Sequence, residues 1–350
     1  MKTFVILVIL AGLTAGAVVR AGNLQPPVPP AAGGTMKTLD QIEPGTTIHA
    51  ADLPLTITES GSYYFTQSIN YTDPNYKAIT IAANDVAIDL RGFSLRGPGS
   101  AVSSDGCGIY ATSMYRNITI SNGTIRGFED YAIYVYSDSV RIKNIRAYDN
   151  GYSGFSAKNA VISNCSAGGN GNYGFMIYNS ILENCTANGN TGSGVYVGSS
   201  PCRIINCAAH ANGNYGFYAY YNSLIKNSVA ARNGSGGFYA KLGGTMQNCT
   251  AVDNGQSNPD SDGIYAYEGC TIVNCTSADN ARDGIRVDHG CRIEGGSLYS
   301  NDNYGLYLVG AGNYAVANIA GSHPSYHNFF NGAGAGNYMP TTGDNRNWGF

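Results

Sequence analysis

One asparagine recurs along most of this 350-residue chain, at intervals of mostly 20 to 22 residues. The recurring positions are Asn122, Asn144, Asn164, Asn184, Asn206, Asn227, Asn248, Asn274 and Asn318, with Gly295 in one repeat. A short period sustained over such a length is typical of a solenoid, in which each repeat packs only on its neighbours. The pattern therefore predicts a stack of coils instead of a single globular core.

The residues around this asparagine indicate that the chain bends there. Two positions earlier lies a large aliphatic residue or Met, as in Ile142, and one position later often lies a cysteine, as in Cys165. In a straight strand these two positions would point to opposite faces, so both point inward only if the chain turns at the asparagine. Asn and Gly accept the left-handed backbone conformation that such a corner needs. We interpret the asparagines as structural corners whose side-chain amides hydrogen-bond from coil to coil.

A second pattern follows about ten residues after each corner. A glycine precedes an apolar residue that is expected to point inward, namely Phe155, Phe175, Val195, Phe217, Phe238, Ile264, Ile285 and Leu306. Apolar residues at helical spacing are absent. Each coil then contains a strand, the Asn corner, a strand, an Asn- and Gly-rich loop and a third strand. The predicted fold class is all-β, a parallel β-helix of about ten to eleven coils with capped ends.

The two ends of the chain depart from the repeat. Residues 1–21, with Lys2 before the apolar run 4–13, predict a signal peptide and hence secretion to the periplasm, the cell surface or the medium. Residues 22–35 predict a Pro- and Gly-rich linker, 36–77 an N-terminal cap, 78–328 the parallel β-helix and 329–350 a C-terminal cap or tail. Loss of the signal peptide would change the net charge from −3 to −5, which argues against a nucleic-acid partner. No later segment is long and apolar enough to predict a membrane span.

Several segments resemble a known group of proteins. They are LPLTI at 53–57, GSYY at 61–64, AITI at 78–81 and VAIDLRGF at 86–93. With the corner asparagines, they resemble exported bacterial right-handed parallel β-helix repeat proteins of the pectate-lyase-like superfamily, the NosD-like branch included. The resemblance covers roughly residues 36–350 and implies a right-handed helix. It also implies that carbohydrate lies along the strand that follows the longest loops, which here begins Gly-Phe-Tyr. The superfamily holds lyases, hydrolases, epimerases and adhesins, so the fold does not decide the activity.

Tyrosines recur at the outward positions of that strand. The candidate carbohydrate-binding residues are Tyr196, Tyr218, Tyr220, Tyr239, Tyr265, Tyr267 and Tyr307. Aromatic rings about one coil apart offer a surface on which sugar rings stack. Tyrosine is also a favoured strand residue that stacks on itself for cross-strand stability. The sequence leaves both interpretations open.

Charged residues interrupt the tyrosines where one repeat lengthens to 26 residues, between Asn248 and Asn274. The candidate catalytic residues are Asp262, Asp283, Arg286, Asp288 and Lys241. Paired carboxylates divide into acid and base when their pKa values are pushed apart. Asp260, Asp262 and Asp283 are alternatively a calcium site, since carboxylate oxygens are the ligands that Ca²⁺ takes. A solvated network of ion pairs is the third interpretation of the same residues.

The nine cysteines are an odd number, so at least one has no partner within the chain. Cys165, Cys185 and Cys207 form one inward run in consecutive coils, and export would permit oxidation. Side chains stacked in parallel rarely present the dihedral angle of a disulfide. We therefore expect the cysteines to be small buried core residues.

Two functional hypotheses remain. The chain is a secreted protein that binds or processes an extracellular polysaccharide, by lyase or hydrolase chemistry, along the tyrosine face. Alternatively, it is a non-catalytic structural or adhesive rod at a cell surface or in a matrix. The sequence leaves the oligomeric state open.

Overall fold

The computed structural model describes residues 45–73, 77–99, 106–112, 114–321, 329–332, 336–339 and 348–349. The predicted signal peptide, the linker and the first part of the predicted N-terminal cap lie outside them. From Gly45 onward the chain forms one compact unit. In the described part, no helix is long and apolar enough to cross a membrane.

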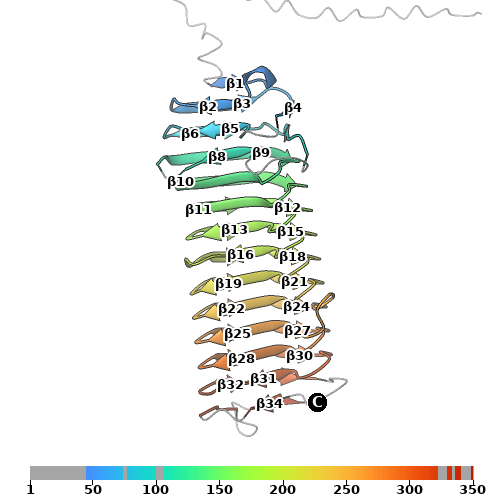
Figure 1. Ribbon diagram of the computed structural model, residues 1–350. Helices are drawn as coiled ribbons and strands as arrows, with labels where there is room; N and C mark the ends of the chain where they lie inside the picture. The colour runs from blue at the N-terminus through green and yellow to red at the C-terminus, as the bar shows by residue number, and fades with distance from the viewer. Residues whose placement is uncertain are drawn as a thin grey trace, which may run out of the picture. The chain divides into compact units, whose positions relative to one another are not determined.

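Three ladders of parallel strands form this unit, and successive coils stack from β1 to β34 (Figure 1). The first ladder comprises β2 (Leu55–Ile57), β5 (Ile79–Ile81), β8 (Ile109–Ala111), β10 (Tyr131–Tyr148), β11 (Ser153–Ser163), β13 (Phe175–Tyr178), β16 (Val195–Val197), β19 (Phe217–Tyr221), β22 (Phe238–Leu242), β25 (Ile264–Glu268), β28 (Ile285–His289), β31 (Leu306–Leu308) and β34 (Phe329–Asn331). The second ladder comprises β1 (Thr46–Ile48), β3 (Gly61–Phe65), β6 (Val86–Asp89), β9 (Arg116–Arg126), β10, β11, β14 (Ile181–Glu183), β17 (Arg203–Ile205), β20 (Leu224–Lys226), β23 (Thr245–Gln247), β26 (Thr271–Val273), β29 (Arg292–Glu294) and β32 (Tyr314–Val316). The third comprises β4 (Ile69–Asn70), β7 (Ser94–Arg96), β9, β10, β12 (Ser166–Gly168), β15 (Thr186–Asn188), β18 (Ala208–His210), β21 (Val229–Ala231), β24 (Thr250–Val252), β27 (Thr276–Ala278), β30 (Ser297–Tyr299), β33 (Ile319–Ala320) and β35 (Trp348–Gly349).

The predicted β-helix is confirmed, with about 12 turns instead of ten to eleven. The additional turns come from both ends, where strands of the segments expected to cap the stack pair with it in parallel. At the start, β2 pairs with β5 and β3 with β6, preceded by β1 and a single 3-10 turn at Ala50–Asp52. At the end, β34 pairs with β31 and β35 with β33.

The predicted asparagine corner is present in the structure. From Asn122 to Asn274, the corner asparagines have positive φ angles, for example 55° at Asn206 and 50° at Asn227. Their amides form a ladder, in which the Nδ2 of Asn227 donates to the Oδ1 of Asn206 at 3.2 Å. The prediction that Asn318 is the last corner is wrong. Ala317 has the positive φ of 52°, and Asn318 is instead buried one position later, where its Oδ1 accepts from the N–H of Gly296 at 2.7 Å.

A second ladder of asparagines lies inside the coils. For the corners from Asn144 to Gly295, an asparagine six residues later has a buried side chain that is hydrogen-bonded to its neighbour in the ladder; the set is Asn150, Asn170, Asn190, Asn212, Asn233, Asn254, Asn280 and Asn301. Asn233 is typical. Its Nδ2 donates to Asn254 Oδ1 at 2.9 Å and to the carbonyl oxygen of Ala209 at 3.1 Å. Each amide thereby satisfies backbone groups that would otherwise be buried without a partner.

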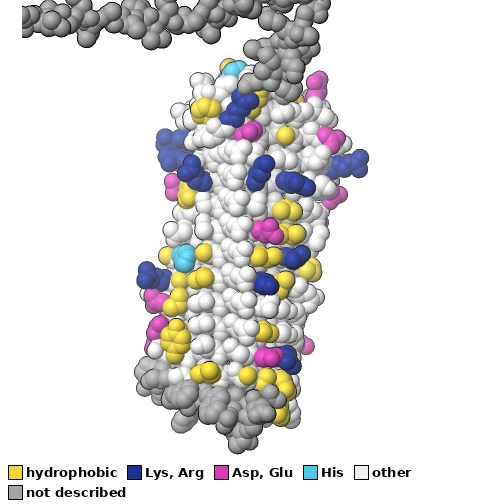
Figure 2. Space-filling model, turned by 180° about the vertical axis from the view of Figure 1, so that it is seen from behind, with side chains coloured by type: hydrophobic (Ala, Val, Ile, Leu, Met, Phe, Trp, Pro, Cys, Tyr) yellow, Lys and Arg dark blue, Asp and Glu magenta, His cyan; other side chains and the backbone are white. Residues whose placement is uncertain are grey.

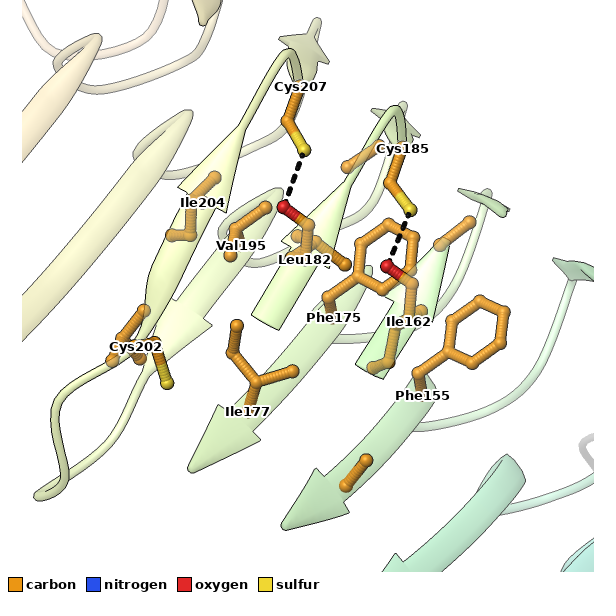
Figure 3. Packing of buried hydrophobic residues seen from close by; sticks show 14 of the residues in the cluster. Phe155, Ile162, Phe175, Ile177, Leu182, Cys185, Val195, Cys202, Ile204 and Cys207 are labelled. Carbon is orange, nitrogen blue, oxygen red and sulfur yellow. Dashed lines mark hydrogen bonds between the residues drawn. The ribbon is translucent and has the colours of Figure 1, made fainter. Parts of the chain in front are cut away.

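The core consists of columns of like residues, as the repeat predicts. The phenylalanines that follow the recurring glycines stack in pairs. The ring centroids of Phe217 and Phe238 lie 4.9 Å apart, with planes 4° from parallel. Aliphatic side chains of the second ladder fill the other side of each coil (Figure 3). A fully buried Phe or Ile contributes about 1.5–3 kcal/mol relative to its exposed state.

All nine cysteines are buried free thiols, in agreement with the expected core role. Their thiols also take part in hydrogen bonds near the bends; Figure 3 shows those of Cys185 and Cys207 directed at backbone carbonyl oxygens of the preceding coil. In the same column, Ser228 replaces Cys, and its Oγ accepts from the N–H of Cys207 at 3.2 Å. Cysteine and serine therefore fill the same small polar position.

Candidate functional site

The outward tyrosines of the first ladder stack on one another. Tyr196, Tyr218 and Tyr239 stand in register on β16, β19 and β22. The ring centroids of Tyr196 and Tyr218 are 5.5 Å apart, and those of Tyr218 and Tyr239 are 4.6 Å apart, with planes 13° and 11° from parallel. Tyr265 continues the column edge-on, with its centroid 5.3 Å from that of Tyr239. The tyrosine ring faces thus cover each other over these coils.

This packing decides which parts of the tyrosines a ligand would meet. Rings stacked at these separations present mainly edges and hydroxyl groups to solvent. A sugar would therefore be held by hydroxyl hydrogen bonds and edge contacts more than by ring stacking. Tyr267, in the next outward column, is more accessible: 37% of its surface is exposed, and its ring meets His289 edge-on at 6.2 Å.

The tyrosine column breaks at Arg286, which stands between Tyr265 and Tyr307 in register. Its guanidinium carbon lies 5.6 Å from the ring centroid of Tyr265 and 5.3 Å from that of Tyr307. These cation–π contacts hold the guanidinium against both rings. Its Nε is buried and has no hydrogen-bond partner. At this position the column therefore carries a partly shielded positive charge in place of a tyrosine.

Two aspartates lie beside Arg286, one in each of two adjacent coils. Asp262 and Asp283 precede equivalent glycines, and the N–H of Gly263 donates to the carbonyl oxygen of Asp283 at 2.8 Å. Asp283 is fully buried and Asp262 is 6% exposed, so Asp262 is the one that solvent reaches. The adjacency that the repeat predicts for the two aspartates is therefore confirmed.

Each carboxylate has a distinct set of partners. The Oδ1 of Asp283 accepts from Asn303 Nδ2 at 2.6 Å and from the backbone N–H of Tyr304 at 3.1 Å. The Oδ1 of Asp262 accepts from the backbone N–H of Asp283 at 3.3 Å. The Oδ2 of Asp283 has no hydrogen bond. The carboxylate of Asp283 is thus held by two hydrogen-bond donors, whereas that of Asp262 has one.

Burial and the neighbouring carboxylate of Asp283 raise the pKa of Asp262 to about 8, while Arg282 and Arg286 oppose the shift. Burial raises the pKa of Asp283 as well. Burial, and then the charge of Asp262, raise the pKa of Tyr215. At neutral pH, Asp262 therefore holds a proton that it can donate. A carboxylic acid kept protonated near pH 7 is suited to act as a general acid.

A recess of about 200 Å³ lies in front of this acid. Its lining residues are Tyr215, Asp260, Ser261, Asp262, Tyr265, Arg282 and Arg286. Gly236 stands in register between Tyr215 and Asp262, and a Cβ there would come within 3.0 Å of the Tyr215 ring. The missing side chain thus leaves room for Tyr215 to lie beside the recess.

The long coil supplies one wall of the recess. The extra residues fold back onto the preceding coil, where the backbone N–H of Ser257 and that of Asn258 both donate to the carbonyl oxygen of Gly234, at 2.8 and 2.9 Å. Asn258 Oδ1 then accepts from the N–H of Asp260 at 3.1 Å. This turn returns the chain to the ladder at Asp262.

Arg282 belongs to the site although sequence reasoning missed it. Its Nε lies 3.8 Å from Asp262 Oδ1 and 3.7 Å from Asp283 Oδ2, and its Nη1 donates to the carbonyl oxygen of Asp260 at 3.1 Å. Its position directly before Asp283 in the sequence could have indicated that it lies near the two acids. The side chain bridges the three aspartates that sequence analysis offered as calcium ligands.

This arrangement does not fit the predicted calcium site. A guanidinium already lies between the carboxylates of Asp262 and Asp283, and a second cation there would be repelled. Throughout the described ranges, no group of three or more His, Cys, Asp or Glu side chains is placed to hold a metal ion.

The two remaining candidate residues do not line the recess. Asp288 accepts a hydrogen bond of 2.7 Å on its Oδ2 from the hydroxyl of Tyr265, which lines the recess. Lys241 points elsewhere, since its Nζ donates to the Tyr220 hydroxyl at 2.5 Å and lies 4.1 Å from that ring centroid. Asp288 thus acts on the site through Tyr265, and Lys241 is not part of the lining.

A parallel β-helix with a charged recess in an outward tyrosine column defines the class of this protein. The family described as "Right handed beta helix region" matches residues 77–200, 106–246 and 180–320. The chain belongs to this family. The predicted likeness to the NosD-like branch remains a prediction.

Several solved structures share the fold. The A-module of mannuronan C-5 epimerase AlgE6 from Azotobacter vinelandii is 17% identical, with a TM-score of 0.58, covering 85% of this chain and 88% of that one. The AlgE4 A-module from the same organism is 15% identical, with a TM-score of 0.59 and coverage of 83% and 88%. A variant of the periplasmic alginate epimerase AlgG is 11% identical, with a TM-score of 0.61 and coverage of 84% and 76%. At these identities the likeness shows the fold alone. Among curated protein sequences, none matches this chain.

Proposed function

We propose that this protein is exported and binds and cleaves an acidic extracellular polysaccharide, with the reacting bond placed at the recess in front of Asp262. The observation that carries the proposal is the recess in which Asp262 and Arg286 lie together, with the pKa of Asp262 raised to about 8 by burial and by Asp283. Solved structures of the same fold include proteins named mannuronan and alginate epimerases, which supports an acidic glycan as the ligand class.

The residues of the recess have separable roles in this proposal. In hydrolysis, Asp262 is positioned to protonate the departing glycosidic oxygen while water adds to the anomeric carbon, and the proton that this water loses returns to the Asp262 carboxylate. In elimination, the same glycosidic oxygen takes the proton of Asp262, and the proton lost from C5 of the uronate takes the place of that of water. Arg286 lines the recess, and a guanidinium there is suited to pair with a uronate carboxylate. Asp283 is a positioning residue, because it is fully buried and its neighbours Asp262 and Arg282 line the recess in its place.

A non-catalytic structural or adhesive rod is the second candidate. The observation that favours it is the mutual stacking of the tyrosines, which stabilises neighbouring coils without any ligand. Under this alternative, Asp262, Arg282 and Asp283 form only an internal ion-pair network. The two functions differ in what substitution of Asp262 does to a polymer substrate.

The test is incubation of the full chain with polygalacturonate, alginate and neutral dextran. New reducing ends report cleavage of either kind, and ultraviolet absorbance of an unsaturated uronate reports elimination. We expect product from at least one acidic polymer, about 100-fold or more slower with Asp262→Asn. Asp253→Asn, at an exposed acid on the third ladder, is the matched control. Absence of product with every acidic polymer would refute the proposed cleavage and favour the rod.

A further inference from the structure

Three arginines line one groove on the third ladder, near the N-terminal end of the stack. Arg96 ends β7, Arg126 ends β9 and Arg146 lies in β10, and all three are exposed. The groove has a volume of about 520 Å³, and its other lining residues are neutral and polar: Ser68, Asn70, Ser94, Thr124 and Tyr148. No acidic side chain lines it. Figure 2 shows Lys and Arg side chains gathered toward the N-terminal end of the rear face.

Strand register brings these charges together. Arg96 pairs directly with Arg126 across the β7–β9 ladder, and Arg146 pairs with Thr124 on the neighbouring outward column. Paired strands are about 4.8 Å apart, so the side chains of Arg96 and Arg126 leave the backbone at that separation. Like charges directly opposite in a sheet are destabilising.

Among the described residues, no acidic side chain forms an ion pair with these three arginines. The ion pairs of the described residues involve other arginines, namely Arg232, Arg282 and Arg292. A second groove on the same ladder shows the contrast: it is lined by His210, Arg232 and Asp253, and there the Arg232 Nε lies 3.2 Å from Asp253 Oδ2. One groove contains its own counter-charge, and the N-terminal groove does not.

The lining indicates what kind of anion fits. Guanidinium groups bind carboxylates and sulfate esters through paired N–H donors. The serine, threonine, asparagine and tyrosine groups beside them are suited to hydroxyl groups, which a glycan carries between its charges. A nucleic-acid partner would call for a larger basic surface than three arginines on a chain of net charge −3.

We infer that this groove is a second binding site for acidic polysaccharide, in which Arg96, Arg126 and Arg146 hold carboxylate or sulfate groups of the chain. The inference takes its ligand class from the proposed function but uses a different face, so it does not depend on Asp262. The groove lies on the third ladder and the recess on the first. It would anchor a polymer without taking part in its cleavage.

The experiment measures binding of the full chain to immobilised polygalacturonate and dextran sulfate, with dextran and duplex DNA for comparison. Arg126→Gln combined with Arg146→Gln removes two charges from the groove. Arg141→Gln combined with Arg203→Gln, at two exposed arginines of the second ladder outside the groove, is the control matched for net charge. Unfolding midpoints of all variants establish that each is folded.

We expect binding to one or both acidic polymers that weakens with added salt, and weakens about tenfold or more in the double variant. The control variant Arg141→Gln with Arg203→Gln should bind like the wild type. Equal binding by the double variant, preference for dextran or absence of binding would overturn the inference, and tighter binding of DNA would assign the groove to nucleic acid. If the wild type binds an acidic polymer through these arginines but cleaves none, the proposed function is refuted and the second binding site stands.

Discussion

The backbone N–H of Asp283 donates a 3.3 Å hydrogen bond to the Oδ1 of Asp262, its counterpart one coil earlier. This bond joins two carboxyl groups that the repeat stacks in one column, with the guanidinium of Arg282 against both. A solenoid aligns equivalent side chains of neighbouring coils at the spacing of a sheet. Two acids in one column are thereby held together, and burial keeps the outer one protonated.

The raised pKa of Asp262 predicts how stability depends on pH. In the folded protein Asp262 keeps its proton up to about pH 8, whereas in the unfolded chain an aspartate loses it near pH 4. Between these values the folded state binds more protons, so the free energy of unfolding falls as pH rises. Urea titration should show the free energy of unfolding of the wild type falling more steeply from pH 5 to pH 8.5 than that of Asp262→Asn. Parallel curves for the two proteins would contradict the assigned pKa.

Two neighbouring residues of β19 should respond differently to truncation. Phe217 is fully buried and stacks on Phe238, so Phe217→Ala should cost about 3–5 kcal/mol. Tyr218→Ala removes stacking on the outer face, worth about 1 kcal/mol for each ring pair. Denaturant titration of both variants measures the difference. A larger loss for Tyr218→Ala would show that the tyrosine column, and not the interior, holds the coils together.

The two asparagine ladders should also differ. Asn233→Ala removes an amide that donates to the carbonyl of Ala209 and accepts from the N–H of Asn212 at 3.1 Å, so we expect a loss of about 3 kcal/mol. Asn227→Gly keeps the positive-φ corner and removes only exposed amide bonds, with a loss below about 1 kcal/mol. The comparison is made by denaturant titration. Equal losses would mean that the inner ladder is not a buried network.

The cysteines should tolerate serine and resist modification. Cys275 Sγ accepts from the N–H of Cys249 at 3.4 Å, as Ser228 Oγ accepts from that of Cys207. Cys275→Ser should therefore change the free energy of unfolding by less than about 1.5 kcal/mol. A thiol reagent should label none of the nine cysteines in the native protein and all nine after unfolding, since all are buried and free. Fast native labelling would contradict that burial.

Much of the fold could be predicted because the repeat depends on local backbone preferences. Asn or Gly at a corner and one apolar residue after a glycine recur in most coils, and from Asn122 to Gly295 the structure has the positive φ angles that these corners need. Asn318 was misassigned because the last coil is one residue out of step, so that Ala317 takes the corner. The inner ladder, Asn233 among it, was read as loop sequence, because Asn before Gly is typical of turns.

The site could be predicted only as a column of charges. The repeat gives the backbone position of Asp262 and Asp283, and hence their adjacency. It does not give the direction of a long side chain, which depends on packing from other coils. For this reason Arg282 was missed. For the same reason Lys241 was expected near the acids, although its side chain contacts Tyr220.

The most direct test of the account is the pH profile of polymer cleavage by the wild type and Asp262→Asn. If Asp262 is the acid, cleavage of an acidic polysaccharide should fall as pH rises through about 8, where Asp262 loses its proton. Asp262→Asn should be at least about 100-fold slower and lose that limb of the profile. A wild-type rate that keeps rising above pH 9, or a variant that retains both rate and profile, would contradict the assignment of this recess as the place of catalysis.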